Sequence, residues 1–177
     1  MKNLMIIILF FFSCSAGAQV RSATIQASGL TCSMCSNSIF KALKTLDFVA
    51  HVEPNIKNST FKISFKPGVQ INFDKLKEKV EDAGFFVANF TVVMNVENLA
   101  VSNDAHVNVG NEVFHFLNVK DKVLSGEQTF RILDKGYVSA KEFKKNSSLT
   151  KMPCYKTGEE NLPTGQAGGK RIFHVTI

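Results

Sequence analysis

The chain has 177 residues, of which 45% are hydrophobic, and carries a formal net charge of +6 at neutral pH. A chain of this length fits one large domain or two small ones. Its lysines are spread along the sequence without a basic stripe interleaved with aromatic residues, so no nucleic-acid partner is expected.

The N-terminus predicts an exported protein. An apolar run over residues 4–12 is followed by small residues up to Ala18, which is the pattern of a signal peptide over residues 1–18. This run is too short to cross a bilayer as a helix, so we expect a periplasmic or secreted chain with no transmembrane segment after cleavage. The alternative is a lipoprotein in which Cys14 becomes the acylated N-terminus, although the bulky residues before it fit that signal poorly.

The predicted elements of the first half alternate between strands and helices. Alternating apolar and polar residues predict strands over residues 22–28, 48–53, 60–66 and 85–92. Apolar residues at helical spacing predict helices over 36–46 and 73–83. The order strand, helix, strand, strand, helix, strand indicates an α+β fold that begins with a ferredoxin-like βαββαβ domain over residues 19–93.

Two cysteines lie three positions apart between the first predicted strand and the first predicted helix, in Gly-Leu-Thr-Cys-Ser-Met-Cys over residues 29–35. We expect Cys32 and Cys35 to lie at a helix N-terminus, where the helix dipole favours thiolates. Two thiolates on a short loop suit a nearly linear site for Cu(I) or Hg(II), whereas Zn(II) prefers four ligands. The pair could instead form a structural or redox disulfide, which exported compartments permit.

This cysteine loop, followed in the same half by Gly84-Phe85, resembles the heavy-metal-associated domain of copper chaperones, copper-ATPase N-terminal modules and the periplasmic mercury-binding protein. The resemblance covers residues 21–93. It implies that Cys32 and Cys35 are the metal ligands, that Cu(I) is the metal, and that Hg(II) or another soft ion is the alternative. Leu30 departs from the family, which usually has a packing Met there.

The second half has a different pattern, in which short β-like runs dominate. We expect a linker or first strand over residues 94–104 and a small β-rich domain over 105–177, folded as an OB-like barrel or sandwich. Its predicted strands cover 105–109, 112–117, 128–133 and 170–177, the first two joined by a Gly110-Asn111 turn. A short helix over 139–145, capped by Ser139, and a polar loop over 157–169 complete the prediction.

Soft and borderline metal ligands occur in the second half without tight spacing, at His106, His115, His174, Met152 and Cys154. His115 and His174 each lie between apolar strand residues, so both should point away from the core, where they could meet if their strands were neighbours. The favoured interpretation is exposed strand histidines and a lone core or loop cysteine, with a second metal site as the alternative. A disulfide from Cys154 to Cys32 or Cys35 in the absence of metal is a further possibility.

The sequence therefore predicts an exported metal-binding protein, a monomer or weak metal-bridged dimer, that sequesters or transfers Cu(I) through Cys32 and Cys35. Its partner would be a metal donor or acceptor, such as a copper-transporting ATPase or an exported copper protein. No enzymatic activity is expected, because the sequence contains no Ser-His-Asp set, Gly-rich phosphate-binding loop or carboxylate pair within a recognisable catalytic motif. The alternatives are a thiol–disulfide redox protein and a metal-responsive adaptor whose β-rich half binds a protein partner.

Overall fold

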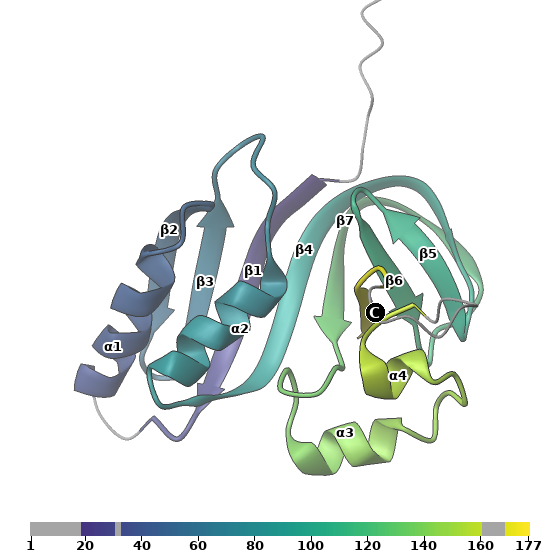
Figure 1. Cartoon of the computed structure of the whole chain (residues 1–177). Helices are drawn as coiled ribbons and strands as arrows, with labels where there is room; N and C mark the ends of the chain where they lie inside the picture. Colours follow the sequence, from purple (N-terminus) through teal and green to yellow (C-terminus); the bar gives the residue numbers. More distant parts are fainter. Residues whose placement is uncertain (1–18, 31–32, 161–168) are drawn as a thin grey trace, which may run out of the picture.

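The computed structural model of the chain describes residues 19–30, 33–160 and 169–177. Eight strands form one sheet with the order β2-β3-β1-β4-β7-β8-β6-β5. Helices α1 and α2 cover one half of this sheet, and α3 and α4 lie beside the other half (Figure 1). Within the described part of the chain, no helix has the length and apolar character needed to span a membrane. The predicted signal peptide and Cys14 lie outside the described residues.

The first half has the expected ferredoxin-like order, with β2, β3, β1 and β4 as successive antiparallel neighbours. Its elements before β4 are β1 (Gln19–Ser28), α1 (Ser33–Lys44), β2 (Val49–Asn55), β3 (Thr60–Phe65) and α2 (Phe73–Asp82). The helices form where the apolar spacing predicts them, because Ile39 and Leu43 of α1 and Leu76 and Val80 of α2 are fully buried one turn apart. Helix α2 is capped at its start by Asn72, whose side chain accepts a hydrogen bond of 2.9 Å from the backbone of Lys75.

Strand β4 (Phe86–Val101) is longer than the strand predicted over 85–92 and continues into the segment expected to be a linker or a first strand. One edge pairs with β1 as far as Asn95, and the other pairs with β7 (Lys122–Ile132) as far as Val101. Of the two alternatives expected for 94–104, a linker or a first strand, the structure has a strand as far as Val101. The physical reason is that the alternation of buried residues continues past residue 93, with Met94 and Val96 both buried.

The second half extends the same sheet edge to edge, and the OB-like barrel or sandwich expected from the sequence is not confirmed for its described residues. Its elements after β4 are β5 (Ala105–Val109), β6 (Glu112–Phe116), β7, α3 (Ala140–Asn146), α4 (Cys154–Thr157) and β8 (Ile172–Thr176). Strand β8 lies between β7 and β6, and its pairing with β6 is parallel. The helix expected over 139–145 is confirmed, with Ser139 capping it through the backbone of Glu142 at 3.2 Å.

One hydrophobic core passes under both halves of the sheet. Phe73 of α2 packs edge-on against Phe90 of β4 and Phe173 of β8, with ring centroids 6.1 and 5.3 Å apart. Tyr137, which follows β7, packs against the same two rings. Apolar contacts therefore join the first half to the second on this face of the sheet.

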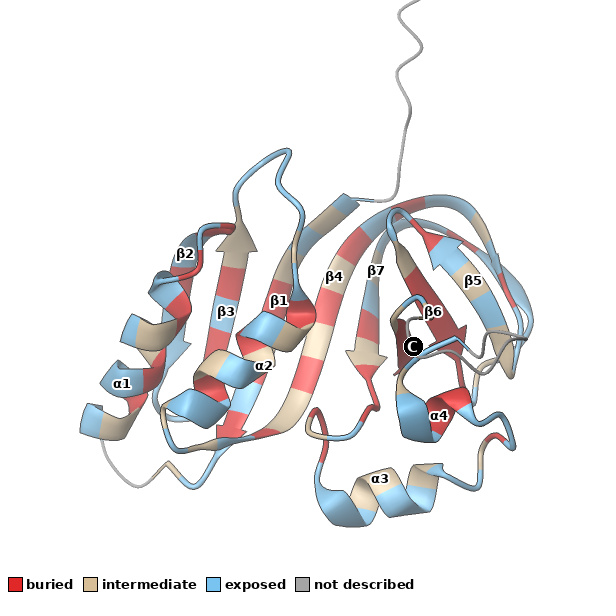
Figure 2. Ribbon diagram, in the orientation of Figure 1, coloured by how far each residue is buried: buried red, intermediate tan, exposed pale blue. Residues whose placement is uncertain are grey.

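A smaller core covers the opposite face at β6 and β8. It is formed by four buried residues with two partly buried ones: Leu117, Leu133, Val138 and Tyr155, with Phe143 and Leu149. Phe143 of α3 stacks on Tyr155 of α4 at 4.8 Å between centroids. Strand β6 is consequently buried along most of its length, whereas β4 alternates (Figure 2).

A polar network also joins the two halves, centred on Asp74 of α2. Arg171, next to β8, donates hydrogen bonds of 3.0 Å to Asp74 and 3.0 Å to Asp134, and the Tyr137 hydroxyl donates one of 2.8 Å to Asp74. Burial opposes ionisation of Asp74, but the hydrogen bonds and the charge of Arg171 outweigh it, so the pKa of Asp74 lies below its ordinary value.

We expect Asp74→Asn to lower the free energy of unfolding at neutral pH by about 1 to 2 kcal/mol, since it removes charge-assisted hydrogen bonds from a side chain that is 33% exposed and partly screened by water. The folded pKa of Asp74 is depressed, so this contribution is complete above the unfolded pKa of about 4 and is lost as the pH falls through the folded pKa. Urea unfolding followed by circular dichroism at neutral pH and below about pH 3 measures both effects. Asp82→Asn, at a side chain that is 66% exposed, is the matched control, and equal losses in the two variants would contradict the prediction.

Candidate metal sites

The predicted thiolate pair belongs to the connection between β1 and α1. Cys35 is half-buried in the first turn of α1, and Cys32 lies outside the described residues. Gly29, just after β1, has a φ of 84°, a left-handed conformation that glycine adopts without strain. A Cβ on Gly29 would lie 4.0 Å from the ring of Phe85, so Phe85 lies beside the start of the loop. Leu30 also packs against the main core, as expected for its position.

The start of α1 provides a favourable electrostatic setting for thiolates. The first turn contains no acidic residue, and the basic residues of the last turn, Lys41 and Lys44, lie at the opposite end of the helix. The positive end of the helix dipole therefore lies at Cys35 without a carboxylate of the same turn to oppose it. This arrangement lowers the cost of ionising a thiol there.

Three of the four histidines in the chain stand in one row across neighbouring strands of the second half. His106 of β5 is paired directly with His115 of β6, and His115 is paired directly with His174 of β8. Residues directly opposite each other on paired strands project from the same face of the sheet. The three imidazoles therefore lie side by side, with ring centroids 4.5 and 4.9 Å apart.

Cys154, the first residue of α4, places its sulfur against all three imidazoles. Its Sγ lies 3.4 Å from Nε2 of His106, 3.5 Å from Nδ1 of His115 and 3.4 Å from Nε2 of His174. The ligand atoms of Cys154, His106 and His115 all lie within 4.8 Å of one another. We refer to Cys154, His106, His115 and His174 as the histidine–cysteine cluster.

The two buried histidines of the cluster each bond a carboxylate through the nitrogen that faces away from the sulfur. Nε2 of His115 lies 2.9 Å from Oδ1 of Asp104, and Nδ1 of His174 lies 2.6 Å from Oδ1 of Asp134. An ionised carboxylate only accepts hydrogen bonds, so these two nitrogens carry the protons and donate. In a neutral ring of His115 or His174, the nitrogen that faces Cys154 then presents a lone pair.

Burial sets the protonation of the cluster. The side chains of His115 and His174 are 0% exposed and Cys154 is 2% exposed, whereas His106 is exposed. Burial lowers the pKa of His115 to about 4 and also lowers the pKa of His106. Burial raises the pKa of the Cys154 thiol. His106 and His115 are therefore neutral near neutral pH, the form in which imidazole binds metal ions.

The structure corrects the expectation that the histidines of the second half are exposed. This expectation is wrong for His115 and His174, because the segment that contains α3 and α4 covers the face on which they lie.

Met152 does not join the cluster and is 37% exposed beside a surface pocket. Cys154 is a core cysteine outside any disulfide, at the opposite end of the sheet order from the cysteine loop. Sequence reasoning missed Asp104 and Asp134, since nothing in their local pattern distinguishes them from other turn aspartates.

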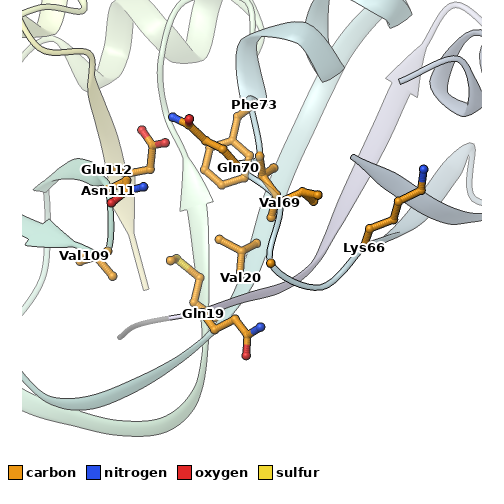
Figure 3. A pocket seen from close by; sticks show the side chains of 13 residues that line it. Gln19, Val20, Lys66, Val69, Gln70, Phe73, Val109, Asn111 and Glu112 are labelled. Carbon is orange, nitrogen blue, oxygen red and sulfur yellow. The ribbon is translucent and has the colours of Figure 1, made fainter. Parts of the chain in front are cut away.

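A surface pocket lies where the 66–71 loop approaches the β5–β6 hairpin and the start of β1 (Figure 3). Phe73 and Val20 form part of its apolar wall, and Glu112 lies at its rim. No cysteine or histidine is among its lining residues, and the thioether of Met94 is the soft donor that lines it. The candidate metal ligands considered further are therefore Cys35 of the cysteine loop and the members of the histidine–cysteine cluster.

Comparison with known proteins places the first half of the chain in a defined family of domains. Residues 24–86 match the family model of the heavy-metal-associated domain, which confirms the resemblance for that segment. The chain is 32% identical over 74 residues to a probable copper-exporting P-type ATPase of Archaeoglobus fulgidus, and 33% identical over 66 residues to the probable copper-transporting ATPase HMA5 of Arabidopsis thaliana. These alignments cover 42% and 37% of the chain but only 9% and 6% of the two relatives, so the chain spans less than a tenth of their length.

Two solved structures are similar to the same part of the chain. The CopZ metallochaperone is 21% identical, with a TM-score of 0.35 and with 38% of this chain and 98% of that chain covered. A copper binding domain from HMA7, a P-type ATPase, is 32% identical, with a TM-score of 0.34 and coverage of 37% and 86%.

We expect Cys154 in the chelator-treated native protein to react with iodoacetamide roughly tenfold or more slowly than in the unfolded protein, because its thiol is buried and its pKa is raised. Timed alkylation followed by peptide mass spectrometry measures the rate at this residue. The same reaction in denaturant is the control. Equal rates in the native and unfolded protein would show that the thiol is accessible and would contradict the structure.

Proposed function

We propose that this chain is an exported protein that binds Cu(I) through Cys32 and Cys35 and exchanges it with another copper protein. The match of residues 24–86 to the heavy-metal-associated domain carries this proposal, because the two cysteines lie within the matched segment. The curated relatives that match are named as copper-exporting and copper-transporting ATPases. Hg(II) is the alternative cargo, since it also accepts two thiolates in a nearly linear geometry.

The local chemistry supports reversible binding. Two thiolates on one loop give Cu(I) a complete but open two-coordinate site, whose remaining coordination positions stay accessible to a partner's sulfurs. The ion can then pass through three-coordinate intermediates without being released to water. The position of Cys35 in the first turn of α1, without acidic neighbours in that turn, favours the thiolate form that this exchange requires.

Exposed apolar side chains next to the loop support docking of a protein partner. Met34, between the two cysteines, is 79% exposed, and Phe86 is 72% exposed. Phe86 is paired with Ser28, the residue that precedes Gly29 at the start of the loop. An apolar border around a thiolate pair would allow close approach of a second metal-binding surface. We propose a copper-transporting ATPase or an exported copper protein as that partner.

The pattern of residues 1–18 supports export to the periplasm or outside the cell, with acylation at Cys14 as the alternative. Export has a chemical consequence for the loop. Cys32 and Cys35 would work in a compartment where thiols oxidise readily, and a disulfide between them would block metal binding. The proposed function therefore requires that this pair be kept reduced.

We expect Cys32→Ser and Cys35→Ser each to remove one equivalent of tightly bound Cu(I), because a hydroxyl is a poor ligand for this soft ion. Anaerobic competition with a chromogenic Cu(I) chelator measures the stoichiometry. Parent and variants should all carry Cys154→Ser, so that the third thiol does not contribute. Met34→Leu, which keeps an apolar side chain between the cysteines, is the matched control and should retain the equivalent. Retention of this equivalent in both cysteine variants would overturn the proposal.

We expect no thiol–disulfide oxidoreductase activity, which separates a metal carrier from the redox alternative. The reduced protein should not accelerate the reduction of insulin by dithiothreitol, and Cys35→Ser should trap no client protein as a mixed disulfide with Cys32. Turbidity of reduced insulin and non-reducing gels are the two measurements. Acceleration of insulin reduction that disappears in Cys35→Ser would establish the redox function instead.

A further inference from the structure

We infer that the histidine–cysteine cluster is a second metal site, which binds one transition-metal ion through Cys154, His106 and His115, with His174 as a fourth donor that contacts the same sulfur. The spacing of its ligand atoms is the first argument. A tetrahedral ion with metal–sulfur bonds of about 2.3 Å and metal–nitrogen bonds of about 2.0 to 2.1 Å separates sulfur from nitrogen by about 3.5 Å. The three sulfur–nitrogen distances in the structure are 3.4, 3.5 and 3.4 Å.

The number of protons in the cluster is the second argument. A thiol has one hydrogen and can donate to one of the three nitrogens around it. The nitrogens of His115 and His174 both face the sulfur with lone pairs, because Asp104 and Asp134 hold the ring protons on the other side. A metal ion bound among the four ligand atoms would satisfy every one of these lone pairs.

The carboxylates behind the histidines are the third argument. Metal-binding histidines commonly donate their second ring proton to a carboxylate, which fixes the ring and makes the ligand nitrogen more basic. Asp134 is fixed in turn, since it is 6% exposed and accepts a hydrogen bond from Arg171. The positions of the ligands are therefore determined by the sheet and by the network that joins its halves.

The cluster is buried on one side and accessible on the other. His115, His174 and Cys154 are buried, whereas His106 is exposed on β5, the edge strand of the sheet. An ion can therefore reach the cluster past His106. Once bound, it would be enclosed by the smaller core, where Tyr155 packs edge-on against His174 with ring centroids 5.0 Å apart.

A catalytic triad is an alternative interpretation of part of the cluster. Its nucleophile, base and orienting carboxylate would be Cys154, His174 and Asp134. Two observations oppose that interpretation. A nucleophilic cysteine needs an accessible sulfur with a depressed pKa, whereas Cys154 is 2% exposed and burial raises its pKa. A catalytic pair also uses a single imidazole, while the sulfur of Cys154 contacts three.

The donor set favours a borderline first-row ion such as copper or zinc. Three imidazoles and one thiolate suit borderline first-row ions, while Ca²⁺ and Mg²⁺ require oxygen ligands, and the two carboxylates here are occupied by the histidines. A four-ligand site also differs from the two-thiolate loop, which is suited to Cu(I) in a nearly linear geometry. The second site is therefore independent of the proposed function of the loop.

The test uses the full chain with Cys32→Ser and Cys35→Ser, so that the loop contributes no thiolate. Co(II) titration should give one equivalent, with visible ligand-field bands of a tetrahedral complex and a near-ultraviolet sulfur-to-metal charge-transfer band. Cu(II) should give an intense visible charge-transfer band, and competition between Zn(II) and copper, read by elemental analysis, identifies the preferred ion. The melting temperature should rise with metal concentration.

Three variants assign these signals to the cluster. Cys154→Ser should abolish the charge-transfer bands, Asp104→Asn should weaken metal affinity about 10-fold to 100-fold by releasing the ring of His115, and His51→Ala, outside the cluster, should change nothing. The parent keeps the whole cluster and reports binding even if a cluster variant fails to fold. Absence of a Co(II) charge-transfer band in the folded parent would overturn the inference, as would rapid alkylation of Cys154 that added metal does not slow.

Discussion

Strand β4 carries the hydrogen bonds that make the two halves one sheet. It has 16 residues, pairs with β1 along one edge and with β7 along the other, and over residues 91–95 both edges are paired at once. The rings of Phe73 and Phe173 cross the same junction beneath the sheet, and Asp74 and Arg171 cross it as an ion pair. Backbone, apolar and charged interactions thus coincide at one boundary, so helix α1, with Cys35 in its first turn, and the histidine–cysteine cluster belong to a common framework.

The sequence predicts the first half well because its signals are local. Helical spacing in α1 and α2, and alternation in β1 and β3, each depend on residues close together in the chain. The second half depends on distant partners. The parallel pairing of β6 with β8, and the covering of their outer face by α3 and α4, have no signature in the residues of those strands. The alternation around His115 and His174 correctly indicates the face on which they lie, but it cannot show that this face is also buried.

The two proposed metal sites differ in the properties that govern exchange. Cys35 of the loop lies in the first turn of α1, next to the exposed side chain of Met34, where a partner's ligands could approach a bound ion. The cluster encloses its ligands between strands and a covering segment, with His106 as the accessible ligand. A two-ligand open site favours transfer, and a four-ligand enclosed site favours retention. In this proposal, one chain combines a site suited to metal transfer with a site suited to metal retention.

The central place of β8 also affects how the chain must fold. This strand comes after all the other described strands in sequence, yet it lies between β7 and β6. Until residues 172–176 arrive, β6 and β7 each have an unpaired edge, which is the kind of surface that pairs with other chains. Closing this gap requires a late contact between segments far apart in sequence, which is a slow kind of step. It is also the step that brings His174 to Cys154, so completion of the sheet and completion of the cluster are one event.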